Sequence, residues 1–353
     1  MDAQATFSGT REVDPRHALD QAALEGWMKA NVDGFSGPVE VRQFKGGQSN
    51  PTYELTTPSA KYVLRRKPPG TLLASAHAVD REFAVISALH AQGFPVARPY
   101  ALCTDDNVLG SMFYVMDKVE GRIFWDLKLP ESTPEERRAI WFEQVDTLAA
   151  LHRLDPVAIG LGDYGKPGNY FGRQVGRWTK QYRASEIDPV PAMDRLIEYL
   201  PATLPPEGPA RIVHGDFRLD NMILDPKEAK VRAVLDWELS TLGDPMADFS
   251  YLLIAYAIPA SLRNGLLGAD IEALGIPSID ELAERYGQQT GLGRPQNLDW
   301  LLSYNLFRLA AICQGIGGRV RDGTAASEHA KAMAAQVGPL SDMAWSYALK
   351  AGA

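Results

Sequence analysis

The first half of the chain alternates between hydrophobic and polar residues in short runs that are typical of β-strands. Three such runs, at residues 39–44 (VEVRQF), 52–57 (TYELTT) and 61–66 (KYVLRR), are separated by turn-forming Gly, Asn, Pro and Ser residues. Two more runs follow at residues 99–103 and 111–117. Because short gaps between alternating runs favour hairpin connections, the pattern predicts a five-stranded antiparallel sheet.

Hydrophobic residues with helical spacing lie before, between and after the predicted strands in the sequence. One helix is expected to start near Pro15, and a second to cover residues 76–92, where a Gly-Phe-Pro turn ends it. Beyond residue 120 the pattern is mainly helical, most clearly over residues 135–154. The hydrophobic stripes of the first two helices are Leu19, Ala22, Ala23, Leu24 and Trp27, and then Phe83, Ile86, Leu89 and His90.

These elements together predict an α+β fold with two lobes. Residues 1–119 form the expected N-terminal lobe, with the sheet and a helix, and residues 120–353 form a mainly helical C-terminal lobe. Residues 1–12 are polar and aperiodic and are expected to be disordered. A chain of 353 residues, 45% of them hydrophobic, is long enough to bury a core in each lobe.

Composition excludes several classes of partner. The formal net charge of −8 provides no basic field for nucleic acid or an anionic membrane. The two cysteines, Cys103 and Cys313, are far apart, which argues against a metal knuckle and suits a reducing compartment. We expect no signal peptide and, because the hydrophobic runs are too short to span a bilayer, no membrane span. We therefore expect a soluble, cytoplasmic protein.

The strongest local motif is HGDFRLDN at residues 214–221, followed by LDWE at residues 235–238. It resembles the catalytic loop of kinases, in which an Asp accepts the proton of the attacking hydroxyl and an Asn five residues later holds Mg²⁺. Asp216 and Asn221 have that spacing, and Asp236 matches the second carboxylate that binds the metal. The resemblance implies phosphoryl transfer from ATP, with Asp216 as base and Asn221 and Asp236 as ligands of Mg²⁺.

Two departures separate this motif from protein kinases. Gly215 stands where an Arg reads phosphorylation of the activation loop, and Pro245 with a hydrophobic helix follows Asp236 within ten residues. No activation segment that could dock a folded protein fits into this interval. HGDFRLDN with LDWELSTLGDP resembles instead the aminoglycoside phosphotransferase superfamily, which includes choline kinases, over residues 39–256. This resemblance implies a protein-kinase-like two-lobed fold and a small-molecule acceptor.

A narrower resemblance rests on five segments: YVLRRKPPG, SAHAVDREF, FYVMDKVEGR, RQVGRWTKQY and VLDWELSTLGDP. They are similar to the kinase-like domain that is fused to acyl-CoA dehydrogenases in animals. The chain ends at Ala353, which we expect to leave no room for a flavin-binding dehydrogenase domain. We therefore expect neither FAD nor dehydrogenase activity.

Candidate nucleotide contacts follow one another in the order seen in kinases. The backbone N–H groups of the turn KGGQSN, at residues 45–50, are expected to cover phosphates. Arg65 stands where kinases carry the phosphate-pairing Lys, with Glu82 as its partner. Arg66, Lys67 or a solvated basic strand end are the alternatives. By analogy, adenine bonds to backbone after Met116. The candidates are Gly46, Gly47, Ser49, Asn50, Arg65, Glu82, Asp117 and Val119.

The acceptor is expected to bind an insertion over residues 164–209, which is rich in aromatic and basic residues. Within it, Arg177, Trp178 and Lys180 suit an anionic, partly hydrophobic acceptor better than a polycationic aminoglycoside. A later run from Asn305 and Arg308 to Arg319 either adds cations or is the solvated face of a helix. The fusion of related domains to acyl-CoA dehydrogenases suggests a hydroxy acid or hydroxyacyl-CoA.

Four further polar residues near the motif are interpreted structurally. His214 is expected to be a hydrogen-bonding scaffold residue, and Asp244 and Asp248 to tie the catalytic loop to the helix that starts near Pro245. Glu238 either binds a second Mg²⁺ through water or is solvated, and we leave it out of the candidate site.

Two hypotheses remain. The first is an ATP- and Mg²⁺-dependent kinase acting on a small hydroxylated metabolite. The alternative is a catalytically silent nucleotide-binding module, favoured by Arg65 and by the lack of a GxGxxG loop but opposed by Asp216, Asn221 and Asp236. The sequence leaves the acceptor's identity and the oligomeric state open.

Overall fold

The computed structural model describes residues 9–45, 50–68, 78–262, 264–323 and 328–353. The chain divides into two compact units that are interleaved along the sequence. Unit 1 consists of Met1–Trp125, Pro156–Tyr164 and Leu219–Ser240, and unit 2 of Asp126–Asp155, Gly165–Arg218 and Thr241–Ala353. The expected lobes are instead consecutive, and their boundary at residue 119 stays a prediction.

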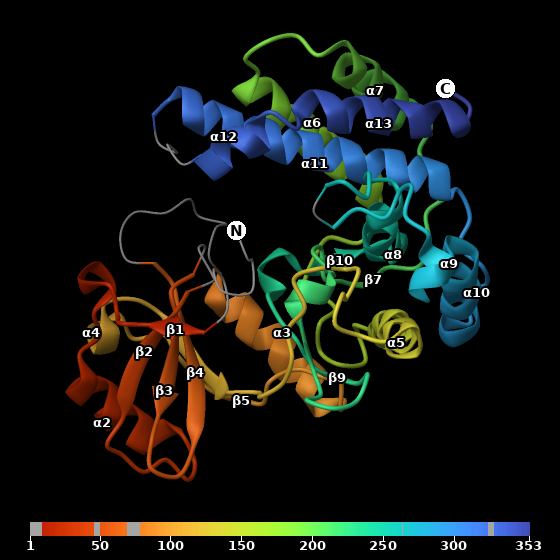
Figure 1. The fold of residues 1–353 in the computed structure, drawn as a ribbon. Helices are drawn as coiled ribbons and strands as arrows, with labels where there is room; N and C mark the ends of the chain where they lie inside the picture. Colours follow the sequence, from red (N-terminus) through yellow and green to blue (C-terminus); the bar gives the residue numbers. More distant parts are fainter. Residues whose placement is uncertain (1–8, 46–49, 69–77, 263, 324–327) are drawn as a thin grey trace. The chain divides into compact units, whose positions relative to one another are not determined.

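Unit 1 is built on a six-stranded sheet in which every neighbouring pair is antiparallel (Figure 1). Its strand order is β1-β2-β3-β4-β6-β5. The five strands expected from the alternating runs are all present, and a sixth is added at the edge. The bounds are β1 (Thr10–Arg11), β2 (Glu40–Phe44), β3 (Thr52–Thr56), β4 (Lys61–Arg66), β5 (Pro99–Cys103) and β6 (Phe113–Asp117).

Strand β1 corrects the expectation that residues 1–12 are disordered. Thr10 and Arg11 pair with Phe44 and Gln43 of β2. The side chain of Arg42 reinforces this edge, since its Nε donates to the hydroxyl of Thr10 at 3.0 Å. An alternation of only two residues is too short to be recognised in a sequence. The strand is evident only from its pairing with β2. Residues 1–8 lie outside the described part of the chain.

The central strands separate a hydrophobic core from a polar face by their two-residue period. Tyr62 and Leu64 of β4 are buried in a core with Leu24 and Met28 of α2 (Gln21–Asn31). Val63 and Arg65 point to the opposite face, where they line a cavity. The same alternation holds in β3 and β6, where Tyr53, Leu55, Phe113 and Val115 join the core and Thr52, Glu54, Tyr114 and Met116 line the cavity.

The two helices predicted in this region are present but begin later than expected. A 3-10 turn, η1 (Pro15–His17), stands at the predicted start, and α2 begins at Gln21, where Asp20 caps it by accepting from the N–H of Ala23. Helix α3 (Val79–Ala91) buries Glu82 with its hydrophobic residues, whereas His90 is exposed. The buried face of α3 is therefore rotated relative to the predicted one, because Glu82 has an ion-pair partner on the sheet. The short α4 (Asp106–Leu109) precedes β6.

Unit 1 also contains a hairpin that carries two of the candidate site residues. Strands β8 (Met222–Leu224) and β9 (Val231–Val234) pair in antiparallel register, with Met222 opposite Val234. The 3-10 turn η2 (Leu219–Asn221) leads into β8, and η3 (Trp237–Leu239) follows β9. Asn221 and Asp236 thus flank the open end of one hairpin, which explains how residues 15 positions apart are brought together.

Unit 2 is mainly helical, as the sequence predicts for the C-terminal part. The long central helix α11 packs against α13, α6 and α12 (Figure 1). The helices are α5 (Pro134–Arg153), α6 (Tyr170–Ser185), α7 (Pro191–Ala202), α8 (Met246–Leu252), η4 (Leu253–Tyr256), α9 (Ile271–Leu274), α10 (Ile279–Thr290), α11 (Leu298–Arg321), α12 (Glu328–Ala334) and α13 (Val337–Lys350). Among the described residues, none of these or the other helices is both long and hydrophobic enough to cross a bilayer.

A two-stranded sheet in unit 2 supports the start of the HGDFRLDN segment. Strand β7 (Arg211–Val213) pairs with β10 (Thr241–Gly243), with Val213 opposite Thr241. Helix α8 begins three residues after β10. The segment that follows β7 is therefore held between a strand and a helix, both of which come from sequence that lies after the motif.

Gly121 offers a test of the packing in unit 1. A Cβ added there would lie 2.1 Å from the carbonyl oxygen of Leu224, to which Arg122 donates at 2.8 Å. We expect Gly121→Ala to lower the free energy of unfolding by about 1–3 kcal/mol, because an overpacked contact has to be relieved. Urea denaturation measures the change.

Gly26→Ala is the matched control. Gly26 lies exposed inside α2 with no heavy atom within 4 Å of an added Cβ. Its replacement by Ala should stabilise the protein by roughly 0.5–1 kcal/mol, since Gly is the poorer helix former. Equal effects of the two substitutions would contradict the close contact at Gly121.

Candidate active site

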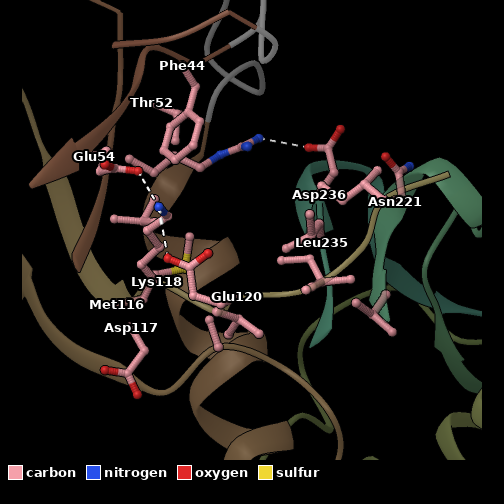
Figure 2. A pocket seen from close by; sticks show the side chains of 18 of the residues that line it. Phe44, Thr52, Glu54, Met116, Asp117, Lys118, Glu120, Asn221, Leu235 and Asp236 are labelled. Atoms are coloured by element: carbon pink, nitrogen blue, oxygen red, sulfur yellow. Dashed lines mark hydrogen bonds and ion pairs between the residues drawn. The ribbon is translucent and has the colours of Figure 1, made fainter. Parts of the chain in front are cut away.

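A cavity of about 600 Å³ lies on the polar face of the unit 1 sheet. Its wall is mostly hydrophobic, with Val63 from β4, Ile86 from α3 and Met116 from β6. Asn221, Leu235 and Asp236 contribute the opposite wall, across from Glu54 and Lys118 (Figure 2). A hydrophobic slot with polar groups at its ends suits a flat ring that carries a charged substituent.

The segment after β6 presents backbone groups at this cavity. Asp117 and Val119 both line it, as the sequence predicts for the residues that bind adenine. The Asp117 side chain accepts from the hydroxyl of Tyr100 at 2.5 Å; burial together with this bond raises the pKa of Tyr100 to about 12. Within the described residues the N–H of Val119 has no hydrogen-bond partner. A backbone donor is thus available beside a hydrophobic slot.

Arg65 is the centre of an ion-pair cluster on the cavity wall. Its Nε lies 2.7 Å from Glu82, and its Nη2 lies 2.8 Å from Asp236 and 3.3 Å from Glu238. The ion pair expected between Arg65 and Glu82 is therefore present. Glu238, which is not among the predicted site residues, shares the guanidinium with Asp236. One cation links the sheet, α3 and the segment after β9.

Strand alternation explains why Arg65 takes this position and its neighbours do not. Arg66 points to the other face of β4, where its Nε donates to the hydroxyl of Ser111 at 2.9 Å. Arg66 and Lys67 are not among the residues that line the cavity. Of the three alternatives for the phosphate-pairing residue, Arg65 is the one with its side chain at the cavity.

Glu82 is held by more than the ion pair. The side chain of Asn50 donates to its Oε1 at 2.8 Å, and the hydroxyl of Tyr114 donates to its Oε2 at 3.1 Å. Asn50 is completely buried and lies behind the cavity wall, so its side chain serves the ion pair. Its predicted neighbours in the phosphate-covering turn, Gly46, Gly47 and Ser49, lie outside the described residues.

Burial and the crowding of carboxylates set the electrostatics of this cluster. Burial, with a further contribution from Asp236 and Glu238, raises the pKa of Glu82 to about 7, although Arg65 opposes the change. Burial alone would lower the pKa of Arg65, but the surrounding carboxylates, above all Glu82, raise it beyond its ordinary value. Arg65 therefore stays charged at every accessible pH, and Glu82 is the member of the pair that titrates.

A second charged cluster at the cavity was missed in the sequence. The ammonium group of Lys118 lies 2.5 Å from Glu54 and 3.0 Å from Glu120 (Figure 2). Glu54 is on the cavity face of β3 because it lies two residues after Thr52, which faces the same way. The strand register, which was predicted, could have identified Glu54. The position of Lys118 after the strand has no such periodicity to reveal it.

Asn221 and Asp236 form a pair of oxygen donors that fits Mg²⁺. The N–H of Leu235 donates to the carbonyl of Asn221 at 2.8 Å, which fixes the two segments side by side. Asp236 has a φ of 66°, a left-handed conformation that is uncommon for a residue other than Gly. In the described part of the chain no three His, Cys, Asp or Glu residues cluster as a metal cage. Mg²⁺ prefers one or two protein carboxylates or amides together with phosphates and water, so this donor set suits it.

In unit 2, Asp248 anchors the loop that carries Asp216. Its two carboxylate oxygens accept from the N–H groups of His214 at 2.6 Å and Gly215 at 2.8 Å. The Nε2 of His152 lies 3.5 Å from the oxygen that accepts from His214. Burial raises the pKa of Asp248, but the hydrogen bonds and charges of His152 and the loop outweigh this and lower it overall. An ionised, buried carboxylate thus fixes the backbone next to the candidate base, as the sequence analysis expected.

His214 and Asp244 also have the structural contacts expected of them. The ring of His214 accepts from the N–H of Asp216 through Nδ1 at 3.2 Å. Asp244 accepts from the N–H groups of Met246 at 2.9 Å and Gly208 at 3.1 Å, so it caps the entry to α8. The carboxylate of Asp216 itself lies 3.1 Å from Arg218 and is 19% exposed.

The predicted acceptor residues all lie on α6 of unit 2 but differ in exposure. Arg177 and Lys180 are exposed, whereas Trp178 is buried. The guanidinium of Arg177 lies 5.4 Å from the centre of the Trp178 ring. The solvated-face alternative for Asn305 and Arg308 is wrong, because both side chains are buried on α11.

Comparison with known proteins places most of the chain in one family. The protein-family model described as "Phosphotransferase enzyme family" matches residues 40–287. The "putative aminoglycoside phosphotransferase" of Ralstonia eutropha JMP134 has a crystal structure with 48% sequence identity and a TM-score of 0.88, covering 94% of this chain and 99% of that one. The predicted resemblance to this superfamily is confirmed, and so is the kinase-like fold.

The curated relatives are longer proteins. Acyl-CoA dehydrogenase family member 10 of Mus musculus is 43% identical over 346 residues, which cover 97% of this chain and 32% of the relative. Family member 11 of Homo sapiens is 42% identical over 341 residues, covering 95% of this chain and 44% of the relative. The chain therefore spans less than half the length of these relatives. The narrower resemblance predicted from the sequence is confirmed.

More distant structures share the fold with different small molecules. An aminoglycoside phosphotransferase mutant solved in ternary complex with AMP-PNP and hygromycin B matches with a TM-score of 0.60 at 14% identity, covering 94% of this chain and 100% of that one. Choline kinase from Cryptosporidium parvum matches with a TM-score of 0.58 at 11% identity, covering 94% and 95%. At these identities the likeness concerns the fold alone.

The Arg65 cluster predicts a pH-dependent loss of stability. We expect Arg65→Gln to lower the free energy of unfolding by about 3–5 kcal/mol at about pH 8, because Glu82 then stays buried without its cation. The loss should shrink at about pH 5.5. A carboxyl whose pKa is higher in the folded than in the unfolded protein is protonated there, and its contribution to stability falls as the pH rises through the folded pKa.

Urea denaturation at both pH values tests this expectation, with Arg65→Lys as the matched control. Lys keeps the charge but not the fork of donors, so its loss should be smaller and should depend less on pH. An equal loss for Arg65→Gln at both pH values would mean that the carboxylates do not depend on Arg65.

Proposed function

Because the chain belongs to the phosphotransferase enzyme family, we propose that it transfers the γ-phosphoryl group of ATP to a hydroxyl group of a small metabolite. The observation that carries this proposal is the unit 1 cavity, whose hydrophobic wall ends in Arg65, Asn221 and Asp236. A hydrophobic slot, a fixed cation and a pair of hard oxygen donors are the groups that a nucleotide with Mg²⁺ needs.

The nucleotide is proposed to enter the cavity base first. Val63, Ile86 and Met116 offer a hydrophobic surface to adenine, and the N–H of Val119 offers a hydrogen bond to it. Arg65 is proposed to contact the phosphates with the part of its guanidinium that faces the cavity. AMP-PNP in the complex of a distant family member supports ATP as the donor.

Asp216 is proposed to orient the acceptor hydroxyl and take its proton. As the acceptor oxygen forms its bond to the γ-phosphorus, the bond between that phosphorus and the β,γ-bridging oxygen breaks, and ADP leaves. Asn221 and Asp236 would hold Mg²⁺, which neutralises charge on the phosphates when it is bound. Asp216 is separated from Asn221 by four residues along the chain, the spacing of a kinase catalytic loop.

The acceptor is proposed to be a hydroxy acid or hydroxyacyl-CoA. The relatives named as acyl-CoA dehydrogenase family members support an acyl acceptor. Arg177 and Lys180 on α6 disfavour a polycationic aminoglycoside. Distant family members named for choline and bound to hygromycin B differ in their small molecules, so the family fold does not dictate the acceptor. We place the reaction in the cytoplasm, where the free thiols Cys103 and Cys313 suit reducing conditions.

The competing function is a nucleotide-binding module without catalysis. One observation favours it: Arg65 is engaged by Glu82, Asp236 and Glu238 together, and Asp236 is one of the candidate metal ligands. If these ion pairs persist with nucleotide bound, the phosphates lose their cation. Turnover decides between the two functions.

Asp216→Asn is the decisive variant. We expect it to lower turnover by about 100- to 10,000-fold, because the acceptor proton loses its base, while ATP affinity stays close to that of the wild type. Asp236→Asn should instead reduce the response to Mg²⁺. The assay follows Mg²⁺-dependent ADP formation with hydroxy acids, hydroxyacyl-CoAs, choline-like alcohols and aminoglycosides, and identifies the phosphorylated product by mass.

Arg195→Gln, an exposed residue over Trp345 on another part of unit 2, is the control and should retain wild-type turnover. Wild-type protein that binds ATP tightly but forms no product with any acceptor would favour the silent module.

A further inference from the structure

Arg308, in the middle of α11, is a buried cation whose charge is not paired. Arg308 is only 7% exposed. Among the described residues no carboxylate lies within ion-pair distance of it, and its one hydrogen bond runs from Nη2 to the carbonyl of Gly215 at 2.5 Å. A guanidinium has five N–H donors, so most of those of Arg308 are unused. Its Nε and Nη1 are not among the fully buried atoms, so these donors stay accessible to solvent or to a ligand.

Arg137 of the same unit shows what a purely structural buried Arg looks like. It is 6% exposed, and its Nε, Nη1 and Nη2 donate to the carbonyls of Leu129, Ser132 and Leu274. All its nitrogens are satisfied by backbone of unit 2. The contrast indicates that the site around Arg308 is incomplete in the protein alone.

Two aromatic rings pack on the guanidinium of Arg308. Its guanidinium carbon lies 5.6 Å from the ring centre of Trp178 on α6 and 5.0 Å from that of Tyr251 on α8. Cation–π contact stabilises the guanidinium through its faces and leaves its edge free for hydrogen bonds. That edge is where the unused N–H groups lie.

Trp178 supplies a second donor without a partner. Its indole N–H is buried, and the described residues provide no acceptor for it. A buried N–H without a hydrogen bond costs free energy, and here it belongs to the ring that packs on Arg308. Two neighbouring side chains thus present donors and no acceptor. The missing group has to be rich in acceptor oxygens.

The candidate base Asp216 does not provide this group. Its carboxylate lies 3.1 Å from Arg218, and its negative charge also acts on Tyr251. Burial, with a further contribution from that charge, raises the pKa of Tyr251, so the phenol stays protonated. Asp216 is near enough to interact electrostatically with Arg308 as well. Arg218 takes the ion pair with Asp216, so the positive charge of Arg308 beside the candidate base is not paired.

We propose that Arg308 and the indole N–H of Trp178 form a subsite that binds an anionic group of the acceptor, a carboxylate or a phosphate. The subsite rests on the proposed function in that Asp216 is taken as the base. In this proposal Arg308 selects acceptors by their negative charge. The exposed Arg177 and Lys180 attract the same acceptors only at long range. An acceptor whose anionic group reaches Arg308 brings its hydroxyl to the neighbourhood of Asp216.

Binding without ATP tests the subsite independently of catalysis. Butyrate and inorganic phosphate are titrated into the full chain, and the melting temperature and heat of binding are followed. We expect one of the two anions to stabilise the wild type, and the better ligand identifies the anionic group as carboxylate or phosphate. Arg308→Gln should weaken binding by about 10- to 100-fold, and Trp178→Phe, which keeps the ring, by a few-fold.

Arg308→Lys is the second variant, which keeps the charge if Arg308→Gln does not fold. It should bind the anion more weakly than wild type but more tightly than Arg308→Gln. Arg195→Gln, which lies over another Trp, should bind like the wild type. An absence of binding by the wild type, or equal binding by the Arg308 variants, would overturn the subsite.

Kinetic measurements distinguish anion binding by Arg308 from a purely structural role, in which Arg308 supports the loop through the carbonyl of Gly215. Hydroxy acids of three to six carbons are compared with the diols of matching length. Arg308→Lys should raise KM for the acids by about tenfold more than for the diols. Equal losses for acids and diols would mean that Arg308 only positions the loop. Anion binding that depends on Arg308 in a protein without turnover would leave the subsite intact and overturn the proposed kinase activity instead.

Discussion

The contact between Arg65 and Glu82 is the constraint on which unit 1 depends. At 2.7 Å it joins the middle of the sheet to α3, and the same guanidinium reaches Asp236 after β9. Hydrophobic packing holds α2 to the other face of the sheet, but the polar face contains the cavity and cannot be closed by packing alone. A buried ion pair, whose carboxylate also accepts from Asn50 and Tyr114, keeps α3 in place there, and it leaves the cavity open.

A comparable arrangement secures the loop that carries Asp216 in unit 2. Asp248 binds two consecutive N–H groups, those of His214 and Gly215, and thereby fixes the backbone before Asp216. Both units use a buried carboxylate as the anchor, Glu82 for a side chain and Asp248 for a loop. Since each anchor is ionised or titratable in a dry environment, neither can be exchanged for a neutral residue without leaving polar partners unsatisfied.

The sequence predicted those features that depend on local periodicity or on a spaced motif. Strands β2 to β6 and the pairing of Arg65 with Glu82 follow from alternation and from the order of kinase elements. The start of α2 was placed too early, because Asp14 and Asp20 both cap a turn and only the second is followed by a full helix. Arg308 was left open between a ligand-binding and a solvated role, since the burial of a helix face depends on helices that are distant in sequence. Tyr251 on α8 was missed for the same reason, whereas Lys118 was missed because it follows its strand and lies outside the periodic pattern.

The two faces of β4 share one register, and this has a consequence for how the site can evolve. Tyr62 and Leu64 fill the core while Val63 and Arg65 line the cavity, so each residue's role is fixed by whether its number is odd or even. Side chains on the cavity face can be replaced one at a time as specificity drifts. An insertion or deletion of one residue in β4 would instead exchange the two faces, placing a guanidinium in the core and leucine at the cavity. Evolution of this protein can therefore change the cavity lining by substitution, whereas changes of length are restricted to the turns at either end of the strand.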